Sequence, residues 1–146
     1  MKDFLIIGNL NAVTYKEVFP LIKDGQVGLG TNSVKAFTMP SGDARKFGNI
    51  VWFVTLSHDR TNPPLTLTAT YTPEAYPRYD NYNAINVDRT KDIPCDYYGV
   101  MGVPISFLDK WCKEQFEIIK FRHGDDGKDL AVNGKCPYFR ILIKHK

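Results

Sequence analysis

The sequence predicts an α/β domain with a mixed sheet, in which one parallel strand–helix unit is followed by antiparallel strands. Near the amino terminus, an uninterrupted apolar run precedes a segment whose apolar residues recur at helical spacing. After that helix, short runs of β-branched and aromatic residues alternate with turn residues. The chain has 146 residues, of which 43% are hydrophobic and 24% charged, and this suits one domain with a buried core. We therefore expect residues 1–146 to form a single domain.

The first predicted strand is the apolar run at residues 4–7. A strand that is covered on both faces has this pattern, so we expect an inner strand of a parallel sheet. Asn9 and Asn11 come directly after it. Open α/β sheets bind ligands beyond the carboxyl ends of their parallel strands, which makes these two side chains candidate ligand-binding residues. Unless a partner chain or a second copy covers it, such a strand is an aggregation hazard.

A helix is predicted at residues 15–22, where Tyr, Val, Phe and Ile side chains share one face. Thr14 and Glu17 have the spacing of a capping box, in which each side chain satisfies the backbone N–H of the other residue. Pro20 is expected to kink or split the helix, because it has no backbone N–H to donate. Gly25 is expected to end it.

The predicted strands that follow this helix are short. They are expected at residues 27–29, 36–39, 50–56 and 65–68. The strongest of them contains residues 51–55, which are almost all β-branched or aromatic. A loop is expected at residues 41–48, and it carries Arg45 and Lys46, with Lys35 close by.

Residues 72–104 are predicted to be loop-rich, with many Tyr and Pro residues. One apolar run in this segment, residues 84–87, predicts a short strand, and Gly99 and Gly102 indicate close backbone packing. A long irregular segment either wraps a domain or carries function. The elements expected after it are a short helix at 106–111, a strand at 116–121, an Asn-Gly hairpin turn at 132–135 and a strand at 138–144.

One tetrapeptide, Asn62-Pro63-Pro64-Leu65, is similar to the catalytic tetrapeptide of amino-methylating DNA methyltransferases. In those enzymes Asp, Asn or Ser precedes two prolines and an aromatic residue; the polar side chain binds the target amine and the ring stacks on the flipped base. Leu65 stands where the ring is needed. An ordinary Pro-Pro turn is the simpler interpretation, so no catalytic residue is assigned.

Membrane and metal chemistry find no support in the sequence. No apolar run reaches the roughly 18 residues that span a bilayer, and none suits a signal peptide. Cys95, Cys112 and Cys136 are widely spaced without a C-x-x-C motif, as expected for reduced thiols. The histidines lie far from one another and from every cysteine, so no metal site is expected. We expect a cytoplasmic protein without a membrane partner.

The net charge of +3 permits contact with nucleic acid without requiring it. Cationic residues that surround a Gly-flanked loop, and residues of the Tyr-rich segment that combine stacking with hydrogen bonding, suit such contacts. They are Lys35, Arg45, Lys46, Tyr79, Tyr82 and Asn83. From the residue types alone, an ordinary polar surface is the alternative interpretation of the same set.

Blocks of sequence at residues 4–9, 14–17, 48–53, 76–85 and 96–110 recur in the same order in one family. Together they resemble the EcoRI-type adenine-specific DNA methyltransferases of restriction–modification systems. The block at residues 96–110, DYYGVMGVPISFLDK, is long enough to be specific. The resemblance runs from end to end of this chain and covers the carboxyl-terminal portion of the family.

The resemblance implies a partial Rossmann-like methyltransferase sheet with a loop-rich carboxyl-terminal elaboration. A complete enzyme of this family is expected to move a methyl group from S-adenosylmethionine to the N6 atom of a flipped adenine in double-stranded DNA. Family members carry the cofactor-binding strands and an Asn-Pro-Pro-Phe tetrapeptide upstream of the segment that matches Phe4. Relatives also have a longer loop between the positions of Gly30 and Gly48.

This chain alone is therefore expected to bind no S-adenosylmethionine and to be inactive. An amino-terminal methyltransferase half, or a second copy of the chain, is the expected protein partner, beside double-stranded DNA. The resemblance places Asn9 and Asn11 close to the adenine pocket in a supporting role. The alternatives are a non-catalytic DNA-binding or accessory module and a decayed fragment without activity of its own.

Overall fold

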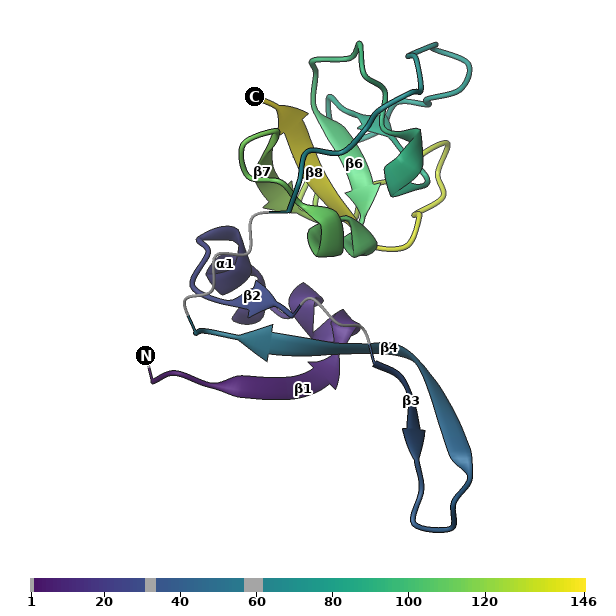
Figure 1. Ribbon diagram of the computed structural model, residues 1–146. Coiled ribbons are helices and arrows are strands. Elements are labelled where there is room, and N and C mark those ends of the chain that lie inside the picture. Colours follow the sequence, from purple (N-terminus) through teal and green to yellow (C-terminus); the bar gives the residue numbers. More distant parts are fainter. Residues whose placement is uncertain (1, 31–33, 57–61) are drawn as a thin grey trace. The chain divides into compact units, whose positions relative to one another are not determined.

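The computed structural model describes residues 2–30, 34–56 and 62–146, whose fold is shown in Figure 1. By their contacts the residues form two compact units, Met1–Arg60 (unit 1) and Thr61–Lys146 (unit 2). Each unit contains one four-stranded sheet. A single cooperative domain over residues 1–146 stays a prediction, which an unfolding experiment tests.

The long strand β4 (Ala44–Val54) is the centre of the sheet in unit 1. β1 (Leu5–Asn9) and β2 (Gly28–Leu29) pair with its carboxyl-terminal half, and β3 (Val34–Thr38) pairs with its amino-terminal half. All of these pairings are antiparallel, so β1 and β2 run parallel to each other on opposite sides of β4. The buried side chains of this unit are Val13, Phe19, Ile22, Val27, Leu29, Val51, Phe53 and Val54.

The expected buried inner strand of a parallel sheet is wrong for β1 within this chain. β1 pairs antiparallel with β4, in the register Leu5 opposite Val54. Its aliphatic side chains are exposed on both faces of the strand, with exposed fractions of 56% for Leu5, 53% for Ile6 and 39% for Ile7. The sequence pattern of a doubly covered strand is present, but the described part of the chain does not supply the cover.

Between β1 and β2 the chain forms a 3-10 helix, η1 (Leu10–Thr14), and a short α-helix, α1 (Val18–Lys23). The helix predicted at residues 15–22 is therefore confirmed in place but starts later. Pro20 does not kink it, because it lies in the first turn, where a backbone N–H has no partner within the helix. Gly25, with a φ of 75°, follows the last turn as predicted.

The predicted capping box is wrong. Glu17 is the N-cap of α1, but its side chain makes no capping hydrogen bond. The hydroxyl of Thr14 instead donates to the backbone oxygen of Asn11 at 2.7 Å, within η1. The chain uses Thr14 to close the preceding 3-10 helix, so α1 begins too late for the predicted pair.

Strands β2 and β3 are confirmed at the predicted places, and β4 is longer than predicted. It begins at Ala44, so the second half of the loop expected at residues 41–48 is strand. The backbone N–H of Met39 donates to the oxygen of Asp43 at 2.8 Å, and Gly42 has a φ of 89°. Glycine permits this tight turn, so the pairing of β3 with β4 begins directly beside it, with Thr38 opposite Ala44.

The sheet of unit 2 has the order β5-β6-β8-β7. Its strands are β5 (Ile85–Asn86), β6 (Met101–Pro104), β7 (Phe116–Phe121) and β8 (Arg140–His145), and the β5–β6 pair is parallel while the others are antiparallel. β8 is an inner strand whose residues Ile141, Leu142 and Ile143 are completely buried. Short 3-10 helices, η2 (Thr90–Asp92) and η3 (Ile105–Lys110), connect these strands.

Most predictions for the tail are confirmed. β5, η3, β7 and β8 lie at the places expected from the sequence. Asn133 and Gly134 have φ values of 50° and 76°, as the predicted Asn-Gly turn requires. β6 was not predicted as a strand, although Gly102 within it packs closely as expected: a methyl group there would overlap the hydroxyl of Tyr79.

The strand expected at residues 65–68 is wrong. The backbone N–H of Leu65 donates to the side-chain oxygen of Gln115 at 2.7 Å, and the Gln115 amide donates to the oxygen of Leu65 at 3.0 Å. A side chain thus takes the hydrogen bonds that a neighbouring strand would make. Over residues 2–30, 34–56 and 62–146, no helix has the length and apolarity to cross a membrane.

Candidate nucleic-acid interface

The structure places the predicted DNA-binding residues in three groups. Asn9 and Asn11 lie where β1 ends, and the cations Lys35, Arg45 and Lys46 lie on β3 and β4 of the same unit. The remaining members, Tyr79, Tyr82 and Asn83, precede β5 in unit 2. Each group is therefore described by itself.

Asn9 and Asn11 lie where the chain leaves β1 and begins η1. The side-chain oxygen of Asn9 accepts a hydrogen bond from the backbone N–H of Asn11 at 2.8 Å, which makes Asn9 the N-cap of η1. Because asparagine is a favoured cap residue, this pattern alone explains its presence here. Asn9 is nevertheless exposed, so its side chain is accessible at the carboxyl end of β1.

The three cations lie on a hairpin formed by residues 34–48, which we call the arm. β1 and β2 pair only with residues 50–54 of β4, so the arm extends past the rest of the sheet as two strands, as Figure 1 shows. Every residue from 35 to 46 is exposed. Arg45 and Lys46 were expected in a loop but lie on β4, and adjacent strand residues point to opposite faces.

The two faces of the arm differ in chemistry. Phe37 pairs with Arg45, and its ring contacts that of Phe47 edge to face, with centroids 5.5 Å apart. The guanidinium carbon of Arg45 lies 5.5 Å from the centroid of Phe47. On the opposite face, Ala36 pairs with Lys46, so small side chains surround one cation there.

Tyr79 is part of the core of unit 2 and not of a surface. Its exposed fraction is 6%, and its hydroxyl donates to the side-chain oxygen of Asn86 at 2.8 Å. Burial raises the pKa of the Tyr79 hydroxyl above its usual range, although the neighbouring Arg140 opposes the shift. The predicted role of Tyr79 in stacking on a base does not fit this burial.

Tyr79 belongs to a buried polar network. The side-chain oxygen of Asn86 also accepts from Nε of Arg140 at 3.1 Å, and its amide donates to Asp88 at 2.8 Å. Arg140 donates in addition to the backbone oxygen of Tyr138 at 2.6 Å. A buried polar group costs stability when it lacks a partner, and these groups have theirs. The network therefore has a structural role.

Tyr82 and Asn83 lie nearer the surface. The ammonium of Lys120 lies 4.4 Å from the ring centroid of Tyr82, so one face of that partly buried ring is covered by a cation. Asn83 is exposed, and its side-chain oxygen accepts from Arg78 at 2.9 Å. Of the three predicted residues in this segment, Asn83 is the most exposed.

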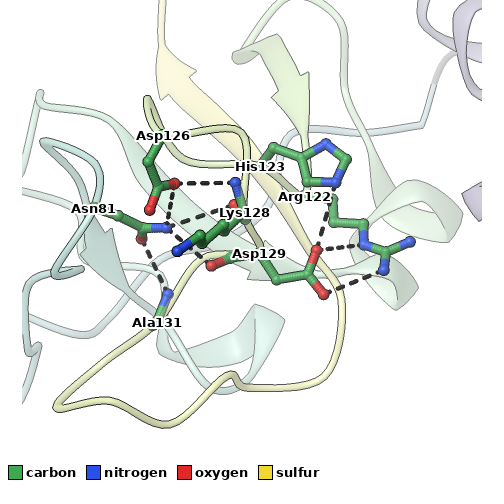
Figure 2. Close-up of polar contacts among 7 residues, drawn as sticks. All are labelled: Asn81, Arg122, His123, Asp126, Lys128, Asp129 and Ala131. Atoms are coloured by element: carbon green, nitrogen blue, oxygen red, sulfur yellow. Dashed lines mark hydrogen bonds and ion pairs between the residues drawn. The ribbon is translucent and has the colours of Figure 1, made fainter.

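Sequence reasoning missed Asn81, which organises a polar cluster in unit 2 (Figure 2). Its amide donates to the carboxylate of Asp126 at 3.0 Å and to the backbone oxygen of Asp129 at 2.9 Å, while its oxygen accepts from the N–H of Ala131 at 3.1 Å. One side chain thereby holds the loop that joins β7 to the Asn-Gly turn. Its position inside the family-like block at residues 76–85 was the available signal.

Arg122 and Asp129 complete this cluster. Two guanidinium nitrogens of Arg122 bind the Asp129 carboxylate at 2.6 and 3.2 Å, as drawn in Figure 2. These hydrogen bonds lower the pKa of Asp129 below its usual range. Arg122 has a φ of 74°, and its guanidinium carbon lies 4.4 Å from the ring centroid of Phe139. The bidentate pair holds a backbone conformation that is uncommon for arginine.

The tetrapeptide at residues 62–65 has a structural role. The amide nitrogen of Asn62 donates to the backbone oxygens of Trp111 at 3.0 Å and Asp109 at 3.3 Å. With Leu65 bound to Gln115 as described, both ends of the tetrapeptide are held by the chain itself. In this structure the Asn62 side chain therefore ties the tetrapeptide to the end of η3 and to the residue that follows it.

A cofactor such as S-adenosylmethionine requires a cradle with polar side chains for its ribose and charged groups. In the part of the chain that the structure describes, the buried polar side chains are those of Asn86 and Arg140, besides the tyrosine hydroxyls. Both serve the network around Tyr79. Neither side chain is therefore free to hold such a group, and no chemical step is derived through it.

Comparisons with known proteins point to one family. Residues 1–146 match the family described as "Adenine-specific methyltransferase EcoRI". The chain is 50% identical over 165 residues to the "Type II methyltransferase M.EcoRI" of Escherichia coli, a match that covers 99% of this chain and 51% of that protein. It is 30% identical over 185 residues to the "Type II methyltransferase M.MpnI" of Mycoplasma pneumoniae, with 99% and 57% covered.

A third relative, "Type II methyltransferase M.MgeORF184P" of Mycoplasma genitalium, is 29% identical over 180 residues, with 98% of this chain and 57% of the relative covered. The chain thus spans about half the length of the curated relatives it matches. No solved structure matches the chain.

Proposed function

Because the chain belongs to the family of EcoRI-type adenine-specific methyltransferases, we propose that it acts as one half of a DNA adenine-N6 methyltransferase. In this proposal it supplies DNA contacts and the far edge of a Rossmann-like sheet. In such an enzyme the amino-terminal half supplies the cofactor site and the catalytic tetrapeptide. S-adenosylmethionine, bound by that half, would provide the methyl group, and this chain alone would be inactive.

The exposed strand β1 carries the proposal. Leu5, Ile6 and Ile7 point alternately to the two faces of the sheet, and all of them are at least 39% exposed. Among the described residues, β1 pairs on one side only, with β4, so its other edge offers unpaired backbone groups. A strand that is apolar on both faces and open at one edge suits continuation of the sheet by another chain.

The direction of the strands also suits such a continuation. β1 and β2 run parallel with the antiparallel β4 between them, and the first crossover contains the helix α1. A parallel strand added beside β1 would give an open sheet with one reversed strand near its edge. Asn9 and Asn11 would then lie at the carboxyl ends of the parallel strands, where such sheets bind ligands.

Reconstitution tests this function. The chain is mixed with the part of the E. coli relative that it does not match, and transfer of a tritiated methyl group from S-adenosylmethionine to adenine in duplex DNA is measured. We expect transfer by the mixture and none by either part. Ile6→Lys, which puts a charge on the open strand, should reduce transfer at least tenfold, and Tyr15→Lys, at an exposed site outside β1, should not.

Calorimetry gives an independent test. If this chain alone binds S-adenosylmethionine with micromolar affinity, the division of labour between two halves is wrong. Transfer by the chain alone would contradict it directly, and equal activity of the Ile6→Lys and Tyr15→Lys mixtures would remove the role of β1.

The alternative function is a non-catalytic DNA-binding or accessory module. The complete core of unit 2 favours it, because Ile141, Leu142 and Ile143 are fully buried without any further chain. The two functions differ in one outcome: the accessory module binds duplex DNA but supports no methyl transfer with any amino-terminal half.

A further inference from the structure

We propose that the arm enters the major groove of duplex DNA as a two-stranded ribbon, with the face that carries Phe37, Arg45 and Phe47 toward the base edges. This inference rests on the proposed function in taking DNA as the ligand. It adds a mode of recognition and two residues, Phe37 and Phe47, that neither the composition nor the cationic pattern pointed to.

The shape of the arm suits a groove. Between the turn and residue 50, β4 pairs with β3 alone among the described strands, so this part of the sheet is two strands wide. Neighbouring strands lie about 4.8 Å apart. The major groove is about 12 Å wide and admits a two-stranded ribbon, whereas the minor groove is about half that width. The tight turn at Gly42 leaves the end of the arm narrow.

The exposed surface of the arm needs a cover. Phe37 and Met39 are each 38% exposed, although both are large and apolar. A two-stranded hairpin of this kind is marginally stable in water when nothing packs on it. A ligand that contacts the Phe37 face would remove this apolar surface from water, and base edges, including the methyl group of thymine, offer an apolar contact there.

The arm has a positive net charge, which favours a polyanion such as DNA as its ligand. Lys35, Arg45 and Lys46 are its cations, and Asp43 is its acid. The Asp43 carboxylate accepts a hydrogen bond from the hydroxyl of Ser41 at 2.9 Å, at the turn. This excess of cations over acids suits binding to the phosphates of DNA, and each contact between a cation and a phosphate releases counterions.

The two faces predict different kinds of contact. Arg45 lies beside Phe47 on the face toward the bases, and arginine binds the O6 and N7 atoms of guanine in the major groove. Lys46 lies on the opposite face with Ala36, so it is assigned to phosphate. Loss of Arg45 should therefore remove base discrimination, whereas loss of Lys46 should weaken binding to every sequence alike.

The test measures the affinity of the full chain for a 30-base-pair duplex that it selects from a random pool, at several KCl concentrations. A second duplex replaces guanine with 7-deazaguanine, which removes N7 from the major groove and leaves the minor groove unchanged. The variants are Phe37→Ser, Arg45→Ala and Lys46→Ala. Lys16→Ala is the matched control, since it removes an exposed cation of unit 1 outside the arm.

We expect the wild-type chain to bind the 7-deazaguanine duplex about tenfold more weakly, and Arg45→Ala to bind both duplexes equally. Lys46→Ala should reduce the slope of log affinity against log salt by about 0.9 without changing the ratio. Phe37→Ser should weaken binding about tenfold at an unchanged slope. Trp52 fluorescence, from within β4, verifies that each variant folds.

Three results overturn the inference. If the wild-type chain binds duplex DNA and the arm variants behave like Lys16→Ala, the arm is not the reading element, while the proposed function stands. If Arg45→Ala retains the preference for guanine over 7-deazaguanine, the major-groove placement is wrong. A wild-type chain that binds no duplex overturns both this inference and the DNA contact of the proposed function.

Discussion

The strands β1 and β8 have similar side chains and opposite environments. Each contains three consecutive branched aliphatic residues, at positions 5–7 and 141–143. In β8 these residues are 0% exposed, whereas in β1 their exposed fractions run from 39% to 56%. β8 lies between β6 and β7, and β1 pairs with β4 alone within the described chain. An apolar run therefore indicates a strand with two apolar faces. It does not indicate whether the same chain covers those faces.

The largest expected effect is a difference in the free energy of unfolding between two leucine-to-alanine substitutions, one in each of these strands. Leu142→Ala should lower the free energy of unfolding of unit 2 by about 3 kcal/mol, because a completely buried leucine leaves a cavity. Leu5→Ala removes a side chain that is 56% exposed, so it should lower the free energy of unfolding of unit 1 by less than about 0.5 kcal/mol. Urea unfolding at low protein concentration measures both.

Each unit contains one of the two tryptophans, Trp52 in unit 1 and Trp111 in unit 2. Trp52→Phe and Trp111→Phe backgrounds therefore report the unfolding of each unit separately. Coincident transitions would show that residues 1–146 unfold as one domain, as the sequence predicts. A cost for Leu5→Ala as large as that for Leu142→Ala would mean that a second copy already covers β1 in solution.

The second prediction concerns the hydrogen bonds by which Asn81 holds a loop of unit 2. Asn81→Ala should lower the free energy of unfolding of unit 2 by about 2 kcal/mol, because the hydrogen bonds to Asp126, Asp129 and Ala131 are lost. Asn83→Ala is the matched control at an exposed site and should change it by less than about 0.5 kcal/mol. Equal effects of the two changes would contradict the assignment of Asn81 as the loop anchor.

The elements that were predicted correctly from the sequence are those whose pattern is local. β7 and the Asn-Gly turn depend on residues that are neighbours in the chain, and both lie where expected. The errors arise where a distant residue decides. Gln115, which is 50 positions away, takes the hydrogen bonds of Leu65 and prevents a strand. β1 is the extreme case, because the described residues leave its apolar side chains exposed.

The candidate site shows the same division. The cations of the arm could be recognised from their residue types, but their shared hairpin depends on the pairing of β3 with β4. Tyr79 was selected as an aromatic residue in a loop, yet Gly102 on β6 leaves room for its ring to enter the core. The residue type of Asn81 did not distinguish it from other asparagines in this loop-rich segment, and its three partners come together only when the chain folds.

The buried tyrosine makes unit 2 sensitive to alkali. Because burial raises the pKa of Tyr79, folding stabilises its protonated form. This stability is fully present below the unfolded pKa of about 10 and is lost as the pH rises from there toward the raised pKa of the folded state. Tyr79→Phe should cost about 1 kcal/mol at pH 7, for the lost hydrogen bond to Asn86, and remove this loss above pH 10. Tyr15→Phe, which changes a tyrosine of unit 1, is the matched control. Thermal melts at a series of pH values decide between them.

The smallest expected effect concerns the Arg122–Asp129 pair, whose side chains are each about one-third exposed. The hydrogen bonds from Arg122 lower the pKa of Asp129, so the stability they confer is present above pH 4 and is lost as the pH falls toward the lowered pKa. Solvent screening keeps it below about 1 kcal/mol. The protection factors of the Leu130 and Ala131 amides, which bind Arg122 and Asn81, should fall on acidification; each protection factor is the intrinsic exchange rate at that pH divided by the observed rate. Asp129→Asn should give low protection factors at every pH, whereas Asp125→Asn, at a carboxylate that is 77% exposed, should follow the wild type. If both variants follow the wild type, the ion pair does not hold this loop.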